Sequence, residues 1–221
     1  HSTLVGSQPG GLDTSRTEPL TGRSTAAALL YAVGLEARGA ASDIRGAADG
    51  GAYAESYVIF RFTPEGDRFA GEVAVNVQPR FAGGVDKAGA DARAKVGQCE
   101  SFMSHCRAIT LPDGSRLTTY DDPSPYSSGV RRVASLYRPD TDFRVIASAT
   151  NGYDVTERAE KVTREDPVLT TDQLVSVVTQ PWWGPRLPAP FTAQGAKLQD
   201  YSDRSASAAV GCGVVNSTDS P

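Results

Sequence analysis

Three strand–turn–strand patterns follow one another between residues 57 and 150, and no other feature limits the fold as strongly. In Glu72–Gln78, valines alternate with polar residues, which is typical of a strand with one buried face. In the second pattern, Pro112, Asp113 and Gly114 form a turn in which proline presets φ and glycine accepts a positive φ. Consecutive hairpins favour an antiparallel meander, here of about six strands. The predicted strands cover residues 57–62, 72–78, 107–111, 115–120, 130–137 and 143–150.

Two amphipathic helix patterns flank these strands. The first begins at Ser24 as N-cap and ends before Gly39, with apolar residues recurring at helical spacing in between. The second has a capping-box pattern at Thr170 and Gln173 and ends at Pro181. Each helix needs a sheet face against which to bury its apolar stripe. We therefore predict an α+β fold, in which an antiparallel sheet of three sequential hairpins packs with an N-terminal and a C-terminal helix.

Composition divides the chain into a lead-in, one domain and a tail. Residues 1–22 are rich in Gly, Ser, Thr and Pro and show no periodicity, so we expect a flexible tether. We expect residues 23–184 to form a single domain, in which the Gly- and Ala-rich segment 40–54 is a loop. Residues 185–221 return to proline, serine and glycine, and we expect them to form a mostly disordered tail.

The charge balance and hydropathy exclude several classes of protein. The formal net charge is −4, from 22 Lys plus Arg and 26 Asp plus Glu, whereas a nucleic-acid-binding protein needs a concentrated basic face. The longest helix-compatible apolar run, Ala26–Leu35, is half the length of about 20 residues that a transmembrane helix needs. No signal-peptide pattern is present. We therefore expect no nucleic-acid partner, and membrane contact only through an anchor outside this sequence.

The spacing of two cysteines is consistent with a disulfide bond. Cys99 and Cys106 bracket a short polar loop, whose closure would stabilise the fold by about 2.5 kcal/mol in the chain-entropy model. Such a bond needs an oxidising compartment; two free thiols in a cytosolic protein are the alternative. If the two pair, Cys212 is left free or forms an intermolecular bond.

The sequence offers little support for a catalytic or metal site. His105 is the one histidine beyond position 1, and it lies beside Cys106, so we expect a solvated loop residue rather than a catalytic base. With Cys99, these two residues do not match the usual spacing of zinc ligands. No glycine-rich nucleotide loop is present, and we expect no cofactor.

Two pairs of carboxylates could serve glycoside hydrolysis, which needs two such groups across one cleft. Asp121 with Asp122, and Glu165 with Asp166, are the candidates, although both pairs lie beside a proline and turn or loop roles are expected. A calcium contact at the hairpin tip with Asp140 and Asp142 is the less expected alternative to a solvated turn.

Aromatic residues are the best candidates for partner binding. Trp182 and Trp183 are adjacent, and large aromatic side chains often mark an interface. We expect at least one of them to close the core under the last helix, while the other contacts a partner. Tyr137 is a further candidate for this aromatic surface.

Four segments in order resemble a group of actinobacterial extracytoplasmic domains, which occur as lipoproteins or as the outer parts of single-span membrane proteins. The segments are the loop 99–106, residues 109–117, the turn 137–140 with the strand after it, and residues 167–174 running to 181–183. Some members of the group are regulator lipoproteins of the sigma-E cell-envelope stress response. The resemblance implies no catalytic residues, a lipid anchor ahead of residue 1, and residues 1–22 as its tether.

Three functions follow as hypotheses. The first is a non-enzymatic, membrane-anchored extracytoplasmic domain that binds a protein partner, such as the outer domain of a sensor kinase, and dampens envelope-stress signalling. The second is a carbohydrate-binding or hydrolytic module of the envelope that uses the paired carboxylates. The third is a structural lipoprotein that scaffolds the envelope, which intermolecular pairing of Cys212 would favour.

Overall fold

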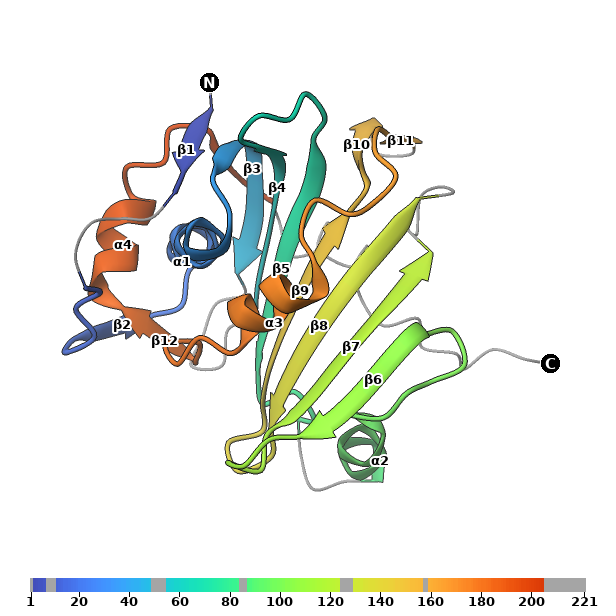
Figure 1. The fold of residues 1–221 in the computed structure, drawn as a ribbon. Coiled ribbons are helices and arrows are strands. Elements are labelled where there is room, and N and C mark those ends of the chain that lie inside the picture. Colours follow the sequence, from blue (N-terminus) through green and yellow to red (C-terminus); the bar gives the residue numbers. More distant parts are fainter. Residues whose placement is uncertain are drawn as a thin grey trace.

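The computed structural model describes residues 2–6, 11–48, 55–83, 87–123, 129–156 and 159–204. Within them the chain forms an α+β fold with one large sheet of nine strands and four helices (Figure 1). The strands of the large sheet are β1 (Thr3–Val5), β3 (Gly39–Ala48), β4 (Ser56–Pro64), β5 (Gly71–Pro79), β6 (Ser104–Thr110), β7 (Arg116–Pro123), β8 (Val130–Arg138), β9 (Phe143–Thr150) and β13 (Tyr201–Asp203).

Two small sheets and four helices complete the fold. Strand β2 (Thr17–Pro19) pairs with β12 (Arg186–Pro188), and β10 (Gly152–Thr156) pairs with β11 (Ala159–Val162). The helices are α1 (Gly22–Glu36), α2 (Lys87–Lys95), α3 (Thr171–Val178) and α4 (Ala189–Gly195). None of these helices is long and apolar enough to cross a membrane.

The three predicted hairpins are confirmed, as β4 with β5, β6 with β7, and β8 with β9. The predicted meander is confirmed for the second and third hairpins, because β6, β7, β8 and β9 are consecutive neighbours. It is wrong for the first hairpin, since the strands lie side by side as β1-β3-β4-β5-β9-β8-β7-β6. The second strand of the first hairpin thus pairs with the last strand of the third, and β13 adds to β3 in parallel. As a result, β6 lies at one end of the sheet.

Strand β3 corrects the prediction of a loop at residues 40–54 over residues 40–48; residues 49–54 lie outside the described part of the chain. Most apolar residues of this strand are alanines, so the sequence shows no clear alternation of apolar and polar residues. In the structure Ala41 and Ile44 are nevertheless fully buried. Gly46 is required for close packing, because a Cβ there would meet the backbone oxygen of Tyr57 at 2.8 Å. The sheet therefore has more strands than the predicted six.

Helices α1 and α3 cover the same face of the sheet and contact each other. Leu29 and Val33 of α1, with Leu174 and Val177 of α3, pack against sheet residues such as Phe60, and all five are fully buried. The capping box of the C-terminal helix is confirmed by its hydrogen bonds in both directions. The N-terminal helix begins earlier than predicted and follows an N-cap at residue 21.

The packed domain extends beyond both boundaries that composition indicates. In the predicted tether, Val5 is 5% exposed and Leu20 is 6% exposed, and both belong to the hydrophobic core. In the predicted tail, Phe191 of α4 is fully buried, and Tyr201 lies in β13 beside β3. The remainder of that tail, with Cys212, lies outside the described residues.

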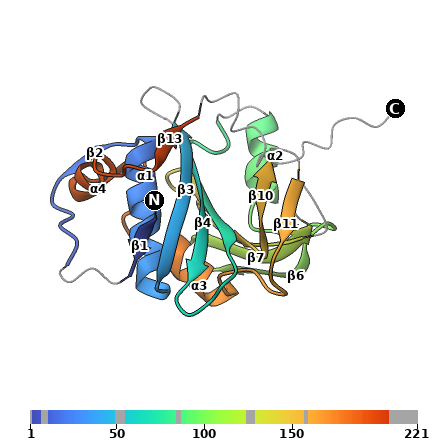
Figure 2. The same ribbon diagram turned by 90° about the horizontal axis from the view of Figure 1, so that it is seen from above.

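The second face of the sheet carries other elements. Seen from above, α2 and the hairpin of β10 and β11 lie on the side opposite to α1 and α4 (Figure 2). The bend of the sheet between β4 and β7 leaves these elements on its inner side. The two faces therefore differ: α1 and α3 pack on the first, and α2 with the hairpin of β10 and β11 lies on the second.

Candidate functional site

Strand β6 forms one edge of the large sheet (Figure 1). Within the described part of the chain it pairs with β7 alone, and six of its seven residues are exposed. An exposed edge presents unpaired N–H and C=O groups that another strand can use. This edge and the pocket beside it, defined below, form the candidate site.

A bulge and a disulfide shape the beginning of β6. The register with β7 shifts between Ser104 and Arg107, and His105 has a φ of 52°, which few residues other than glycine adopt. The predicted disulfide is confirmed: Cys99 and Cys106 are bonded, with their Cα atoms 5.8 Å apart. The bulge turns the imidazole outward, where its side chain is 84% exposed.

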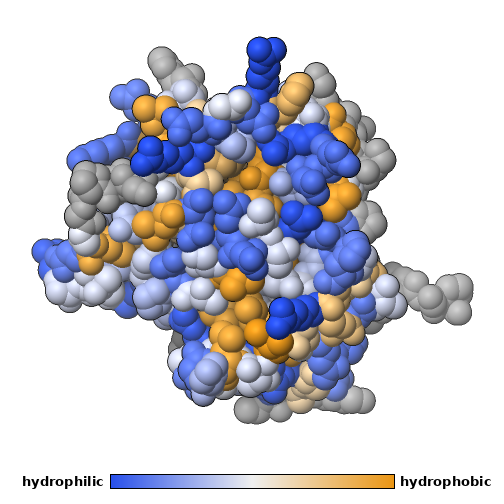
Figure 3. All heavy atoms as spheres, viewed as in Figure 1, coloured by the Kyte–Doolittle hydropathy of each residue, from blue (hydrophilic) through white to orange (hydrophobic). Residues whose placement is uncertain are grey.

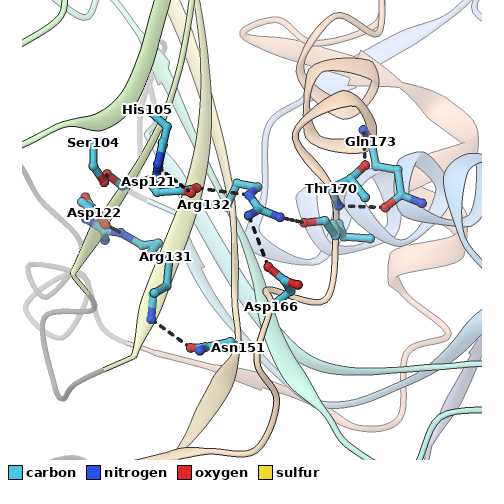
Figure 4. Close-up of polar contacts among 12 residues, drawn as sticks. Ser104, His105, Asp121, Asp122, Arg131, Arg132, Asn151, Asp166, Thr170 and Gln173 are labelled. Atoms are coloured by element: carbon cyan, nitrogen blue, oxygen red, sulfur yellow. Dashed lines mark hydrogen bonds and ion pairs between the residues drawn. The ribbon is translucent and has the colours of Figure 1, made fainter.

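A chain of ion pairs runs from the bulge towards α3 (Figure 4). The Asp121 carboxylate lies 3.5 Å from His105 Nδ1 and accepts a hydrogen bond of 3.1 Å from Arg132 Nε. Arg132 also lies 3.8 Å from Asp166 and donates to the backbone oxygen of Leu169 at 3.4 Å. The arginine thus joins the sheet edge to the loop that precedes α3.

His105, Asp121 and Arg132 help to line an open pocket of about 340 Å³ next to β6. Its lining consists of His105, Thr119, Tyr120, Asp121, Arg132 and Thr171. Because Arg132 is shared between two carboxylates, the pocket offers hydroxyl and imidazole groups rather than an unpaired cation. The pocket suits a neutral polar side chain that enters from the edge of the sheet.

The predicted pairs of carboxylates do not meet in one cleft. Asp121 and Asp122 are neighbours on β7, so they point to opposite faces of the sheet. Asp122 is 6% exposed and receives two hydrogen bonds from Arg131, of 2.9 and 2.7 Å. Asp166 forms an ion pair with Arg132, and Glu165 is exposed in the same loop. This arrangement does not provide the facing acid and base of a glycoside hydrolase.

The described residues also form no site for the other chemistry considered from the sequence, none of which was expected. Cys106 is held in the disulfide, so it cannot act as a nucleophile beside His105. Asp142 accepts hydrogen bonds from the Tyr137 hydroxyl at 2.9 Å and from the Ala82 N–H at 3.1 Å, which makes it a brace of the hairpin. Among the described residues, no three histidine, cysteine or acidic side chains gather as metal ligands.

The structure places the aromatic candidates mainly inside the protein. Trp183 is 1% exposed, and its indole N–H donates to the backbone oxygen of Val177 at 2.7 Å, so it closes the core under α3. Tyr137 is also fully buried. Trp182 is partly exposed and packs edge-on against Tyr31, with ring centroids 5.5 Å apart. Trp182 is therefore the one of these three rings with surface to offer a partner.

Sequence reasoning missed the edge site itself. Nothing in the sequence of β6 tells whether one or two strands flank it, because pairing is set by distant segments. The acidic pair Asp121–Asp122 and the basic pair Arg131–Arg132 were an available signal, since opposite charges directly across two antiparallel strands stabilise the pairing of the strands.

Fold and site together define an α+β domain with an open edge strand. Comparison of the chain with protein-family models, with curated proteins and with solved structures finds no match.

Proposed function

We propose that this chain is a non-catalytic extracytoplasmic domain, anchored to the membrane by a lipid, that binds a protein partner in the cell envelope and dampens envelope-stress signalling. The observation that carries the proposal is the open edge of β6. The disulfide supports an oxidising, extracytoplasmic setting. The resemblance to regulator lipoproteins supports the signalling role.

The hydrogen bonds of the hairpin indicate which groups of β6 face outward. The Leu111 N–H donates to the backbone oxygen of Ser115 at 2.8 Å, just beyond the end of the strand. Because bonding alternates along an antiparallel pair, Ile109 and Arg107 direct their N–H groups to β7. Ala108 and Thr110 therefore direct theirs away from the sheet, where an added strand can accept them.

The side chains of β6 indicate the chemistry of the partner. The strand carries His105 and Arg107 and no acidic residue. Ile109 shares the face of Arg107 and is 38% exposed. Hydrophobic residues gather nearby, over the lower ends of β7 and β8 in the view of Figure 1 (Figure 3). We infer an extended segment of another envelope protein that places an acidic side chain near Arg107 and an apolar one near Ile109.

Site-specific photo-cross-linking in cells tests the proposal. The cross-linking residue replaces Thr110, which is exposed on β6, and in a control protein it replaces Lys197, which is exposed at the end of α4. Products from position 110 are identified by mass spectrometry. We expect a link to an envelope protein from position 110 alone, with a sensor kinase as the expected partner. Equal links from both positions, links to a second copy only, or none would contradict the proposal.

A further inference from the structure

The disulfide fixes the beginning of β6 to a segment that is anchored separately. Cys106 is a residue of β6, whereas Cys99 lies shortly after the end of α2. The end of α2 is held by Arg116 of β7, which donates hydrogen bonds to the backbone oxygens of Arg93 at 2.8 Å and of Val96 at 3.3 Å. The bond therefore joins the edge strand to a part of the chain that β7 already holds in place.

The other contacts at the beginning of β6 are few and exposed to water. Within the described part of the chain, Ser104 Oγ donates to the backbone oxygen of Asp121 at 2.8 Å on the surface. His105 lies in the bulge at a positive φ, and its ion pair with Asp121 is of the exposed kind that contributes little. Such a backbone conformation persists only where its surroundings enforce it. The disulfide is therefore the main restraint on this part of β6.

Loosening the beginning of β6 costs the rest of the domain little. Six of the seven residues of the strand are exposed, and the hydrophobic core includes none of them. The far end of the strand stays closed, because the Leu111 N–H donates to the backbone oxygen of Ser115 at 2.8 Å across the turn. The order of β6 can therefore change while the core under α1 and α3 remains folded.

The bond is open to attack by a thiol. Cys99 is exposed and Cys106 is half-buried. Thiol–disulfide exchange requires that a thiolate reach one of the two sulfur atoms, and exposed disulfides are the labile and regulatory ones. An exposed disulfide that restrains the docking strand itself is thus placed to control that strand.

We propose that the Cys99–Cys106 disulfide is a redox switch for the edge of β6, opened by a dithiol protein of the cell envelope. The inference rests on the proposed function, whose docking edge the switch regulates. A thiolate of the dithiol attacks Cys99 Sγ, the S–S bond breaks, and Cys106 Sγ leaves with the electron pair and takes up a proton. The second thiol of the dithiol loses its proton and attacks the mixed disulfide, which releases Cys99 as a thiol. Two electrons thus pass to the cysteine pair, and the dithiol becomes a disulfide.

Reduction weakens the binding of the partner because it removes order from the docking strand. Ala108 and Thr110 present their N–H groups in line while β6 is held against β7. A partner that binds a loosened strand must first order it, and that cost lowers the affinity. We expect a loss of about tenfold, within the usual range for coupling between two sites.

Reduction of the folded chain is the first test. The full chain carries Cys212→Ser, so that Cys99 and Cys106 supply every thiol that is counted. Dithiothreitol without denaturant is expected to cleave the bond equally fast in this protein and in its Val177→Ala variant, which is less stable because it lacks buried methyl groups. Faster cleavage in Val177→Ala would mean that the bond opens only in the unfolded chain. That result, or a bond that resists dithiothreitol, would overturn the inference.

Hydrogen exchange of the same chain measures what the bond holds. The Arg107 N–H, which is directed to β7, is expected to exchange about tenfold faster after reduction, because the beginning of β6 then opens locally. The Ile109 N–H, nearer the closed turn, should change less. Val177→Ala with the bond intact controls for lower stability and should leave the Arg107 rate unchanged. Equal exchange of Arg107 before and after reduction, or the same acceleration in the control, would contradict the switch.

Photo-cross-linking from Thr110 in cells connects the switch to the partner. The double variant Cys99→Ser with Cys106→Ser is expected to give a yield per molecule about tenfold below that of Val177→Ala with the bond intact. Undiminished links in the double variant would overturn the inference and leave the proposed function standing. Absence of links in both proteins would contradict the proposed function, and with it the docking role of the switch, even where hydrogen exchange shows that β6 loosens.

Discussion

Individual side chains decide how this protein responds to pH. The phenol of Tyr137 is fully buried and donates to Asp142, and burial together with that carboxylate raises its pKa to about 12. The pKa of an unfolded tyrosine is about 10. The folded state therefore holds the proton more tightly, and this contribution to stability is complete below about pH 10 and lost as the pH rises towards about 12.

Replacing Tyr137 by phenylalanine should make the protein less sensitive to alkali. We expect the free energy of unfolding of the wild type to fall more steeply above about pH 10 than that of Tyr137→Phe. Tyr120 and Tyr201 also have a raised pKa from burial, so the variant should keep part of the slope. Urea unfolding at a series of alkaline pH values measures the difference. Parallel curves would show that Tyr137 ionises as readily in the folded protein as in the unfolded one.

Trp183 should be the more important of the two adjacent tryptophans for stability. Its indole is buried and hydrogen-bonded, so Trp183→Ala is expected to lower the free energy of unfolding by about 3–5 kcal/mol. Trp182→Ala serves as the matched comparison and should cost less, because that ring is partly exposed. Urea unfolding measures both variants, and an equal cost would contradict the placement of Trp183 as the core residue.

Among the elements, β6 has local features that limit how it pairs with other strands. The bulge at His105 and the charge of Arg107 discourage indiscriminate pairing with other strands. The disulfide ties the strand to the segment after α2. Hairpin turns and the capping box of α3 are local signals, which is why the sequence predicts these elements well. The edge position is not local and could not be predicted.

Loss of the disulfide should destabilise the domain moderately. The double variant Cys99→Ser with Cys106→Ser is expected to lower the free energy of unfolding by about 2.5 kcal/mol, the entropy of closing a loop of this length. Cys212→Ser is the control and leaves the bond intact. Denaturant unfolding without reductant provides the measurement, and a double variant as stable as the control would show that the bond constrains nothing.

Proline at the outward-facing position of β6 should block strand addition. Ala108→Pro removes an N–H that does not bond to β7, so the domain should stay folded while cross-linking from Thr110 falls about tenfold. Ala108→Thr keeps the N–H and should cross-link normally. If both variants cross-link equally, the partner does not bind as an added strand.

For the whole molecule, pairing between distant segments determined what the sequence could not indicate. Strand β5 is separated in the chain from its neighbour β9 by α2 and three strands, β6, β7 and β8, and no local pattern encodes that pairing. The sequence predicts no packed structure at the two ends of the chain, because their composition is polar. Single residues there, such as Val5 and Phe191, nevertheless belong to the hydrophobic core. Consequently the α+β class was predictable, whereas the strand order and the site were not.

Truncation tests the extent of the domain. A chain that ends at Arg204 retains α4 and β13, whereas one that ends at Gly184 loses Phe191 and Tyr201 from the core. We expect the longer fragment to unfold cooperatively and the shorter one to be unfolded or molten. Thermal unfolding followed by near-ultraviolet circular dichroism compares them. If both fragments unfold with equal cooperativity, the folded domain ends at residue 184, as the sequence predicts.

The order of strands also sets how far the domain can reach. Strand β1 lies at one end of the order and β6 at the other, so seven strand spacings separate them, about 34 Å along the sheet at about 4.8 Å each. A protein fixed ahead of β1 would hold its pairing edge away from the point of attachment. With the proposed lipid anchor, such a domain would act as a rigid arm, and the bend of the sheet would determine the direction in which that arm extends from the membrane surface.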